Sequence, residues 1–192
     1  MTIRYLPATG YVSMPWKNGT GSTDEICLLP PDASRDAFEL RVSRAIIATS
    51  GLFSAFPGVE RTITVIEGEG LALEFDDHDV DLTTGQPHRF DSGLTPVGVP
   101  KGGTVRVVNV MAARDAWHLA PAEILTAGTL VQPEPHGLTI VFALRGASEL
   151  SDSQATVTLG QEDCALLDAP ARFVPENGSA LLVVPLRRAS GA

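Results

Sequence analysis

The stretch RTITVIEGEG, from Arg61 to Gly70, decides the fold class. Thr, Ile and Val dominate its first half and glycines close it, which is the composition of a short β-strand that ends in a tight turn. Similar runs recur between turn residues, because the 18 glycines and 14 prolines fall at short intervals along the chain. The sequence therefore predicts an all-β protein, either a barrel or a sandwich. The other strand-like runs are FELRVSRAII (38–47), GLALEF (70–75), TVRVVNVM (104–111), LTIVFAL (138–144), ATVTL (155–159), CALLD (164–168) and ALLVVPL (180–186).

The stretch around Gly68 has a counterpart in the second half of the chain. One strand ends at Gly68 and another at Gly146, and after about thirty residues a Pro-x-x-Gly turn opens a further apolar strand, at Pro100 and at Pro175. This rhythm is typical of a cupin, a small jelly-roll-like β-barrel made of two sheets. Two copies predict a bicupin in one compact chain, although Gly and Pro turns in any all-β chain can also align by chance.

Alignment of the two copies indicates which half contains the candidate ligand-binding side chains. It places Thr139 opposite Arg61 and Val184 opposite Asn109, so the charged and amide groups occur only in the first copy. We therefore expect one ligand site, in the N-terminal half, and a structural C-terminal half. The expected bounds are residues 1–118 and residues 119–192.

The composition limits the classes of partner. Hydrophobic residues make up 44% of the 192 residues, enough for a core, and the net charge is −9. Nucleic acids and anionic membranes both require a basic surface, so we expect neither as a partner. An acidic protein binds an anion only through a focused local cation. No apolar run has the length of a signal peptide core or a membrane span, so we expect a soluble, cytoplasmic protein.

Histidines and cysteines are too scattered to suggest a metal site. Many cupins hold a metal through a His-x-His pair, whose side chains point the same way from a strand. No such pair occurs, and no histidine lies in an expected strand. Cys27 and Cys164 belong to no zinc motif or disulfide framework, and no nucleophile motif is present. We expect no metal, no cofactor and no catalytic residue. The four histidines are His78, His88, His118 and His136.

Polar side chains gather in the stretch PWKNGTGSTDEI, from Pro15 to Ile26. Trp16, Lys17 and Asn18 bring a large aromatic ring, a cation and an amide together, a combination that ordinary surface loops rarely show. The glycines beside them allow close approach of the backbone. This stretch is a candidate edge of a binding site.

The run LRVSRA carries unexpected polarity within a predicted strand. Leu40 and Val42 take one face of that strand, whereas Arg41 and Ser43 take the other. If the second face lines the interior, Arg41 enters a core and requires a partner, for which Glu25 is the candidate across the sheet. The alternative is that Arg41 faces solvent.

The stretch GLFSAFPGVER places Phe53, Ser54 and Phe56 just before Arg61. An arginine beside aromatic rings suits a planar carboxylate, because its guanidinium donates two parallel hydrogen bonds. The rings could then cover the flat part of a ligand. The equally weighted alternative is that Phe53 and Phe56 plug the barrel mouth while Arg61 reaches out to solvent.

Four blocks in this order resemble the HutD/Ves family. That family's pattern runs roughly Trp-Lys-Asn-Gly-Gly-Gly-x-Thr-x-Glu-Ile, then Trp-Arg-Val-Ser-x-Ala, then Gly-x-Phe-Ser-x-Phe-Pro-Gly-x-x-Arg, then Asn-x-Met. This chain departs from it at Thr20, in place of a glycine, and at Leu40, in place of a tryptophan. The matching blocks are PWKNGTGSTDEI (15–26), LRVSRA (40–45), GLFSAFPGVERTITVIEGEG (51–70) and VVNVM (107–111).

The resemblance implies a metal-free bicupin associated with bacterial histidine utilisation. It implies binding of a small pathway acid, such as urocanate, formylglutamate or formate, and moderation of pathway flux. The Ves branch is linked to stress responses and leaves the ligand open. In this interpretation Arg61 clamps the carboxylate, and Asn109 and Ser43 supply neutral hydrogen bonds. The full set of candidate ligand-binding residues is Trp16, Lys17, Asn18, Thr23, Glu25, Arg41, Ser43, Phe53, Ser54, Phe56, Arg61 and Asn109.

Two other functions compete with ligand binding. The first is a metal-free isomerase or lyase with Glu25 as base and Lys17 or Arg61 stabilising an oxyanion. An ion pair between Glu25 and Arg41 would stabilise the charged carboxylate and weaken it as a base, which disfavours the enzyme. The second is a structural or protein-interaction role without a small ligand. Cupins often dimerise through exposed strands, so a homodimer is also an expectation.

Overall fold

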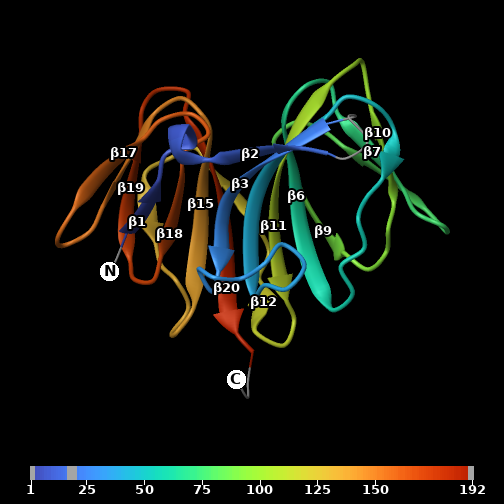
Figure 1. Ribbon diagram of the computed structural model, residues 1–192. Coiled ribbons are helices and arrows are strands. Elements are labelled where there is room, and N and C mark those ends of the chain that lie inside the picture. Colours follow the sequence, from blue (N-terminus) through green and yellow to red (C-terminus); the bar gives the residue numbers. More distant parts are fainter. Residues whose placement is uncertain (1–2, 17–20, 190–192) are drawn as a thin grey trace. The chain divides into compact units, whose positions relative to one another are not determined.

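The computed structural model describes residues 3–16 and 21–189, and they form the all-β protein that the sequence predicts (Figure 1). All eight strand-like runs of the sequence contain strands. The chain forms two compact units. We call Val12–Trp117 the first unit, and the residues up to Tyr11 together with those from His118 onward the second unit. No helix in the described ranges has the length and apolarity needed to cross a membrane.

The first unit contains a six-stranded and a four-stranded sheet, and its neighbouring strands are antiparallel. The six-stranded sheet has the order β2 (Val12–Pro15), β3 (Gly21–Leu29), β4 (Leu40–Ile47), β11 (Val105–Ala113), β6 (Val59–Glu67) and β9 (Pro87–Asp91). The four-stranded sheet has the order β5 (Gly51–Leu52), β10 (Val97–Pro100), β7 (Leu71–Glu74) and β8 (Asp79–Leu82).

The second unit has the same division into a larger and a smaller sheet. A single 3₁₀ turn, η1 (Ala8–Gly10), follows its first strand. The larger sheet has the order β1 (Ile3–Leu6), β18 (Cys164–Leu167), β15 (Leu138–Arg145) and β20 (Ala180–Arg188), with β12 (Trp117–Leu119) and β13 (Glu123–Leu125) both on β20. The smaller sheet has the order β14 (Thr129–Val131), β19 (Ala171–Pro175), β16 (Ser148–Ser151) and β17 (Thr156–Leu159).

Eight consecutive strands of each unit pair in one pattern, β4 to β11 in the first unit and β13 to β20 in the second. In the first unit β11 pairs with β4 and β6, and β6 also pairs with β9. In the second unit β20 pairs in the same way with β13 and β15, and β15 also pairs with β18. In the first unit β10 pairs with β5 and β7, and β7 also pairs with β8. In the second unit β19 pairs with β14 and β16, and β16 also pairs with β17. The internal repeat predicted from the sequence is therefore present as a repeat of strand pairing. In the described residues this pairing gives two separate sheets per unit rather than one closed ring.

One apolar core fills each unit between its two sheets. In the first unit, Ile63 and Val65 of the larger sheet pack in the same cluster as Leu71 and Leu73 of the smaller sheet. In the second unit, Val141 and Ala143 of the larger sheet pack in one cluster with Leu150 and Phe173 of the smaller sheet. Because side chains alternate along a strand, the residues that share this inner face are every second residue, which fixes the register of each strand.

The strand register corrects one detail of the sequence alignment. Arg106, which pairs with Glu67, lies six positions after Pro100, whereas Ala180, which pairs with Arg145, lies five positions after Pro175. The second turn is thus one residue shorter, and the counterpart of Asn109 is Val183 rather than Val184. Val183 belongs to the apolar core of the second unit, so this half offers no amide at the equivalent place.

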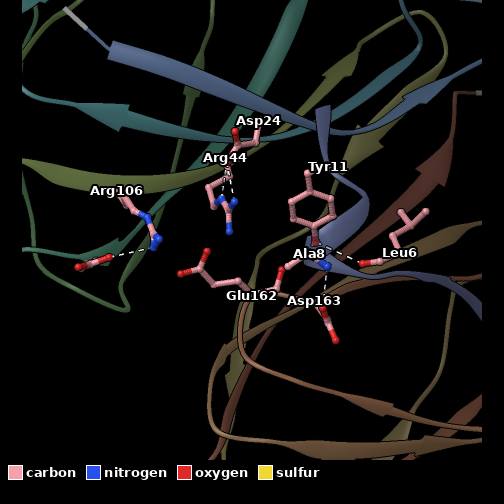
Figure 2. Close-up of polar contacts among 9 residues, drawn as sticks. Leu6, Ala8, Tyr11, Asp24, Arg44, Arg106, Glu162 and Asp163 are labelled. Carbon is pink, nitrogen blue, oxygen red and sulfur yellow. Dashed lines mark hydrogen bonds and ion pairs between the residues drawn. The ribbon is translucent and has the colours of Figure 1, made fainter. Parts of the chain in front are cut away.

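The N-terminal segment is bound to the second unit through Asp163, which is buried (Figure 2). Its carboxylate accepts hydrogen bonds from the Tyr5 hydroxyl at 2.8 Å, the Ala8 amide at 2.7 Å and the Gly160 amide at 2.9 Å. The hydrogen bond to Asp163 raises the pKa of Tyr5. The Tyr11 hydroxyl adds a bond of 2.7 Å to the Glu162 carbonyl. These bonds fix β1 beside β18.

An Asp163→Ala substitution should destabilise the protein by about 3 kcal/mol or more, because it removes the charged acceptor shared by three partly buried hydrogen bonds. Urea unfolding monitored by circular dichroism would measure the loss. Asp152→Ala is the matched control, since Asp152 accepts bonds from the nearby amides of Gln154 and Ala155 in an exposed turn. Equal losses in the two variants would contradict the role given to Asp163.

Candidate functional site

The candidate site lies on the inner face of the six-stranded sheet of the first unit, where rows of side chains cross the strands. In one row Met111 on β11 is paired with Arg41 on β4 and with Arg61 on β6. In the next row Asn109 is paired with Ser43 and with Ile63. Beyond it the face becomes apolar and joins the core. Polar groups from three adjacent strands therefore meet beside the core.

Arg41 is buried and held by Glu25 of β3. The Nε atom of Arg41 lies 3.1 Å from each carboxylate oxygen of Glu25, and its Nη2 lies 3.1 Å from Oε2. The Nε atom of Arg35 lies 3.2 Å from the same Oε2. The partner predicted for Arg41 from the sequence is confirmed, and the solvent-facing alternative is wrong. Because two arginines occupy its carboxylate, Glu25 is poorly placed to act as a general base.

Arg61 is the most enclosed charged side chain of this face, with 5% exposure. Its Nε and Nη2 atoms donate to the hydroxyl of Ser92 at 3.1 and 2.8 Å. Its guanidinium carbon lies 5.1 Å from the ring centre of Phe53, 5.8 Å from that of Phe56 and 5.5 Å from that of Phe90. Arg61 therefore does not reach out to solvent, and three aromatic rings surround it.

The charge of Arg61 has no anionic partner within residues 3–16 and 21–189. Burial, and then the positive charge of Arg41, lower its pKa to about 9. At neutral pH the group is still a cation. Contacts with aromatic faces offset part of the cost of burial, by about 0.5–2 kcal/mol each, but they do not neutralise the charge. The site therefore has an unmatched positive charge within a protein of net charge −9.

The loop before β6 is shaped around Arg61. The Phe56 amide donates to the Ser92 carbonyl at 2.9 Å, and the Ser92 amide donates to the Val59 carbonyl at 2.9 Å, so one residue orders both the loop and the guanidinium. On β10, Gly98 leaves room for the Phe53 ring, because a Cβ atom there would lie 2.5 Å from the Phe53 Cε2. Phe53 and Phe56 are thus positioned over the cation.

Asn109 contributes a buried amide next to the two arginines. The residue is 5% exposed, and its Oδ1 atom has no hydrogen-bond partner in the described parts of the chain. Ser43 is buried directly across from it on β4. Both side chains point to the face that carries Arg41 and Arg61, as the alternation along the strands requires.

The other candidate residues lie elsewhere. Trp16 packs against the apolar core, and its Nε1 donates to Thr23 Oγ1 at 2.8 Å. Gly21 makes this packing fit, because a Cβ there would lie 2.9 Å from the Trp16 ring. Ser54 is exposed in the loop before β6 and is not part of the buried cluster. Lys17 and Asn18 fall outside the described residues.

A depression of about 390 Å³ opens next to this cluster. Val59 and Ala113, which line it, are paired one row beyond Arg61 and Met111, a step of about 7 Å along the strands. Phe38 lines it as well, and the Phe38 and Phe56 ring centres are 5.8 Å apart. Phe56 therefore contacts both Arg61 and a ring that lines the depression.

Sequence reasoning missed several members of the site. Ser92 and Phe90 contact Arg61 from a strand and turn about thirty residues away, and Arg35 contacts Glu25 from an irregular loop, so no local pattern points to them. The expectation that no histidine lies in a strand was wrong. His88 lies in β9, paired with Ile63, and His118 lies in β12.

Burial, and then the nearby His78, lower the pKa of His88. Within the described ranges no three His, Cys, Asp or Glu side chains are grouped as metal ligands would be. Two ion pairs on this sheet lie away from the candidate site. One joins Arg44 to Asp24 at 2.5 Å (Figure 2). Another joins Arg106 to Glu67 at 3.0 Å. The Arg106–Glu67 pair provides the control substitutions for the buried cluster in the Discussion.

Comparison with known proteins agrees with this fold. Protein Ves of Citrobacter koseri is 36% identical over 147 residues, which cover 76% of this chain and 74% of that protein. An uncharacterized 21.2 kDa protein encoded in the hutC 3′ region of Pseudomonas putida is 33% identical over 182 residues, 86% of this chain and 87% of that protein.

A solved structure extends the similarity to nearly the whole chain. HutD from Pseudomonas fluorescens SBW25, determined in a formate condition, superposes with a TM-score of 0.84 at 26% identity and covers 98% of this chain and 100% of its own. More distant structures share only the cupin-like fold. The family model of HutD matches residues 8–183. The chain therefore belongs to the HutD family.

Proposed function

We propose that this protein binds a small carboxylate at Arg61 and acts as a metal-free ligand-binding protein. The observation that carries the proposal is the buried guanidinium of Arg61, which donates hydrogen bonds to Ser92 and has three aromatic neighbours but no counter-ion among the described residues. A carboxylate would supply that counter-ion through two parallel hydrogen bonds. Among the buried groups, Arg41 and Glu25 neutralise each other, so the cluster keeps one positive charge for the ligand.

The surroundings of Arg61 fit a small, flat ligand. The rings of Phe53 and Phe56 cover the guanidinium, and Asn109 and Ser43 provide neutral polar groups one row away. One bidentate pair in a partly dry site contributes about 1.5–3 kcal/mol per charged hydrogen bond, which together with aromatic contacts suits roughly micromolar binding. Entry from the adjacent depression would require the Phe56 ring to turn aside.

The biological role belongs to the same proposal. Two of the similar proteins are named for HutD and for the hutC region, whereas the Citrobacter koseri relative is named Protein Ves. The first two names support a ligand from histidine catabolism, such as urocanate, formylglutamate or formate, and a role in moderating flux through that pathway. HutD from Pseudomonas fluorescens was determined in a formate condition, and formate is the simplest carboxylate. We further propose that the repeated strand pattern corresponds to two cupin-type barrels and that the protein works in the cytoplasm.

A thermal-shift titration tests carboxylate binding directly. Wild-type protein would be titrated with formate, formylglutamate, urocanate and histidine, and with formamide as a neutral relative of formate. A ligand at 100 times its dissociation constant adds about 2.7 kcal/mol to the free energy of unfolding, which is readily seen. Stabilisation by at least one acid, with none by formamide, is expected. The absence of any shift across the series would favour a structural role.

Ligand affinity should fall at high pH because of the lowered pKa of Arg61. Above about pH 9 the free guanidinium loses its proton, and a neutral guanidine cannot pair with a carboxylate. A bound carboxylate favours the charged form, so the pKa is higher in the complex than in the free protein. Calorimetric titrations should give a constant dissociation constant between about pH 6 and 8 and a rise of up to about tenfold per pH unit above 9. Affinity that increases above pH 9 would contradict an Arg61 site.

A further inference from the structure

We infer that Asn109 selects the ligand, so that the protein prefers carboxylates that also carry an N–H donor a few bonds from the carboxylate carbon. This inference rests on the proposed function, because it assumes that the carboxylate is held at Arg61. It adds a requirement that Arg61 alone does not impose, since a guanidinium accepts any carboxylate of suitable size. The starting observation is the buried, unpaired Oδ1 atom of Asn109.

An unpaired acceptor in a dry interior is costly. A buried amide oxygen without a donor forfeits about 1–3 kcal/mol relative to one that is hydrogen-bonded, so native proteins rarely keep one without a reason. Asn109 is 5% exposed and lies between Ser43 and Ile63 in the middle of the sheet. The equivalent position in the second unit, Val183, shows that this place in the fold accommodates an apolar side chain. The amide is therefore not required by the fold.

The position of Asn109 ties this acceptor to the Arg61 site. On β6, the residue directly across from Asn109 is Ile63, and Arg61 is the next residue on the same face. Diagonal neighbours of this kind lie about 7–8 Å apart at the backbone, within reach of long side chains. The buried hydroxyls of Thr62 and Thr64 also have no partner among the described residues, but they lie on the opposite face of β6. Asn109 is thus the unpaired acceptor that faces the two arginines.

The chemistry of the pair defines the ligand class. Arg61 offers only donors and takes the carboxylate, whereas Asn109 Oδ1 offers only lone pairs and takes an N–H. A ligand with both groups satisfies both residues at once. A ligand in which an oxygen replaces the N–H leaves Oδ1 unpaired and places two lone pairs against each other. Sites that hydrogen-bond a polar group reject analogues that lack it much more strongly than apolar sites reject a change of size.

A matched set of probes tests the inference. N-acetylglycine, N-acetyl-β-alanine and 4-acetamidobutyrate carry a carboxylate and an amide N–H at increasing separation, and the corresponding acetoxy acids replace that N–H with an ester oxygen of similar size. Calorimetric titration of wild-type protein should show at least one amide binding about tenfold or more tightly than its ester. In Asn109→Val, which copies Val183, the preference should fall to within about twofold, while folding stability stays equal or rises.

The outcomes distinguish a failure of the role given to Asn109 from a failure of the proposed carboxylate binding at Arg61. Equal binding of amide and ester at every spacing, with binding lost in Arg61→Met, would overturn the role of Asn109 and leave carboxylate binding intact. A preference that survives in Asn109→Val would likewise overturn it. No binding of any probe, nor of formate or urocanate, would overturn the proposed function itself. Retained circular dichroism of Asn109→Val, together with its unfolding midpoint, shows that the variant is folded.

Discussion

An Arg61→Met variant should lose carboxylate binding while folding at least as stably as the wild-type protein. Truncating one partner of a buried charge pair costs about 2–5 kcal/mol of binding free energy, so the dissociation constant should rise by at least about thirtyfold. Stability should not fall, because the substitution removes a buried cation that has no counter-ion in the described residues and leaves an apolar side chain among three aromatic rings.

The pH dependence of stability sharpens this expectation. Burial lowers the pKa of Arg61 in the folded protein, so the charged guanidinium opposes folding at neutral pH. That penalty is fully present below about pH 9 and is relieved as the pH rises above it, because the unfolded chain then holds the proton more tightly than the folded chain does. The stability advantage of Arg61→Met over wild type should therefore shrink between about pH 9 and 11. Urea unfolding of both proteins at several pH values measures this difference in the free energy of unfolding.

The control is Arg106→Met, on β11. Arg106 pairs with the exposed Glu67 and points away from the face that carries Asn109. This variant should bind carboxylates as the wild-type protein does. If Arg61 were only a structural residue, its replacement would lower the unfolding free energy and no acid would stabilise even the wild-type protein. The combination of lost binding with preserved stability separates a binding residue from a structural one.

The sequence predicted the fold better than it predicted the site, and for a physical reason. Strand runs such as RTITVIEGEG carry their own local preference and their own closing glycines, so the all-β class and the repeat are visible along the chain. Glu25 could be named as the partner of Arg41 if that residue faced the interior, because an anion on a neighbouring strand offsets the cost of burying a cation, but the sequence left a solvent-facing Arg41 open.

Contacts that depend on register could not be predicted in the same way. Ser92 and Phe90 reach Arg61 because β9 pairs with β6, and that pairing is fixed by the whole sheet rather than by either segment. Arg61 itself was left open between a buried clamp and a group reaching solvent, since Phe53 and Phe56 suit both alternatives. The tertiary structure decides between them by enclosing the guanidinium.

A Glu25→Gln variant should lose about 3–5 kcal/mol of folding stability, the second large effect that the structure predicts. The substitution keeps the shape of the side chain but removes the charge that neutralises Arg41, and both groups have side-chain exposures of 11%. Arg41 and Arg61, which lie on either side of Met111, would then have no anion between them. Arg35, the other partner of Glu25, would also lose its anion, but its charge is partly screened by solvent. Urea unfolding of the purified variant measures the loss.

Two comparisons identify the source of that loss. Glu67→Gln breaks the pair with Arg106, but Glu67 is 66% exposed, so its cost should stay below about 1 kcal/mol. The double variant Glu25→Gln with Arg41→Met should recover much of the stability, because removing both charges leaves none buried without a partner. An additive loss in the double variant would show that the ion pair is not what Glu25 contributes.

The Glu25→Gln substitution should strengthen ligand binding although it lowers the free energy of unfolding. The Glu25–Arg41 pair would then affect stability and ligand affinity in opposite directions. Glu25 screens the positive potential that a carboxylate meets at Arg61, so its neutralisation leaves two buried cations to attract one anion. Formate or urocanate should therefore bind Glu25→Gln more tightly than wild type and restore part of its lost stability. Weaker binding in a folded Glu25→Gln would mean that Glu25 contacts the ligand itself. Tighter binding would mean that the Glu25–Arg41 pair limits the affinity of the Arg61 site in exchange for a stable fold.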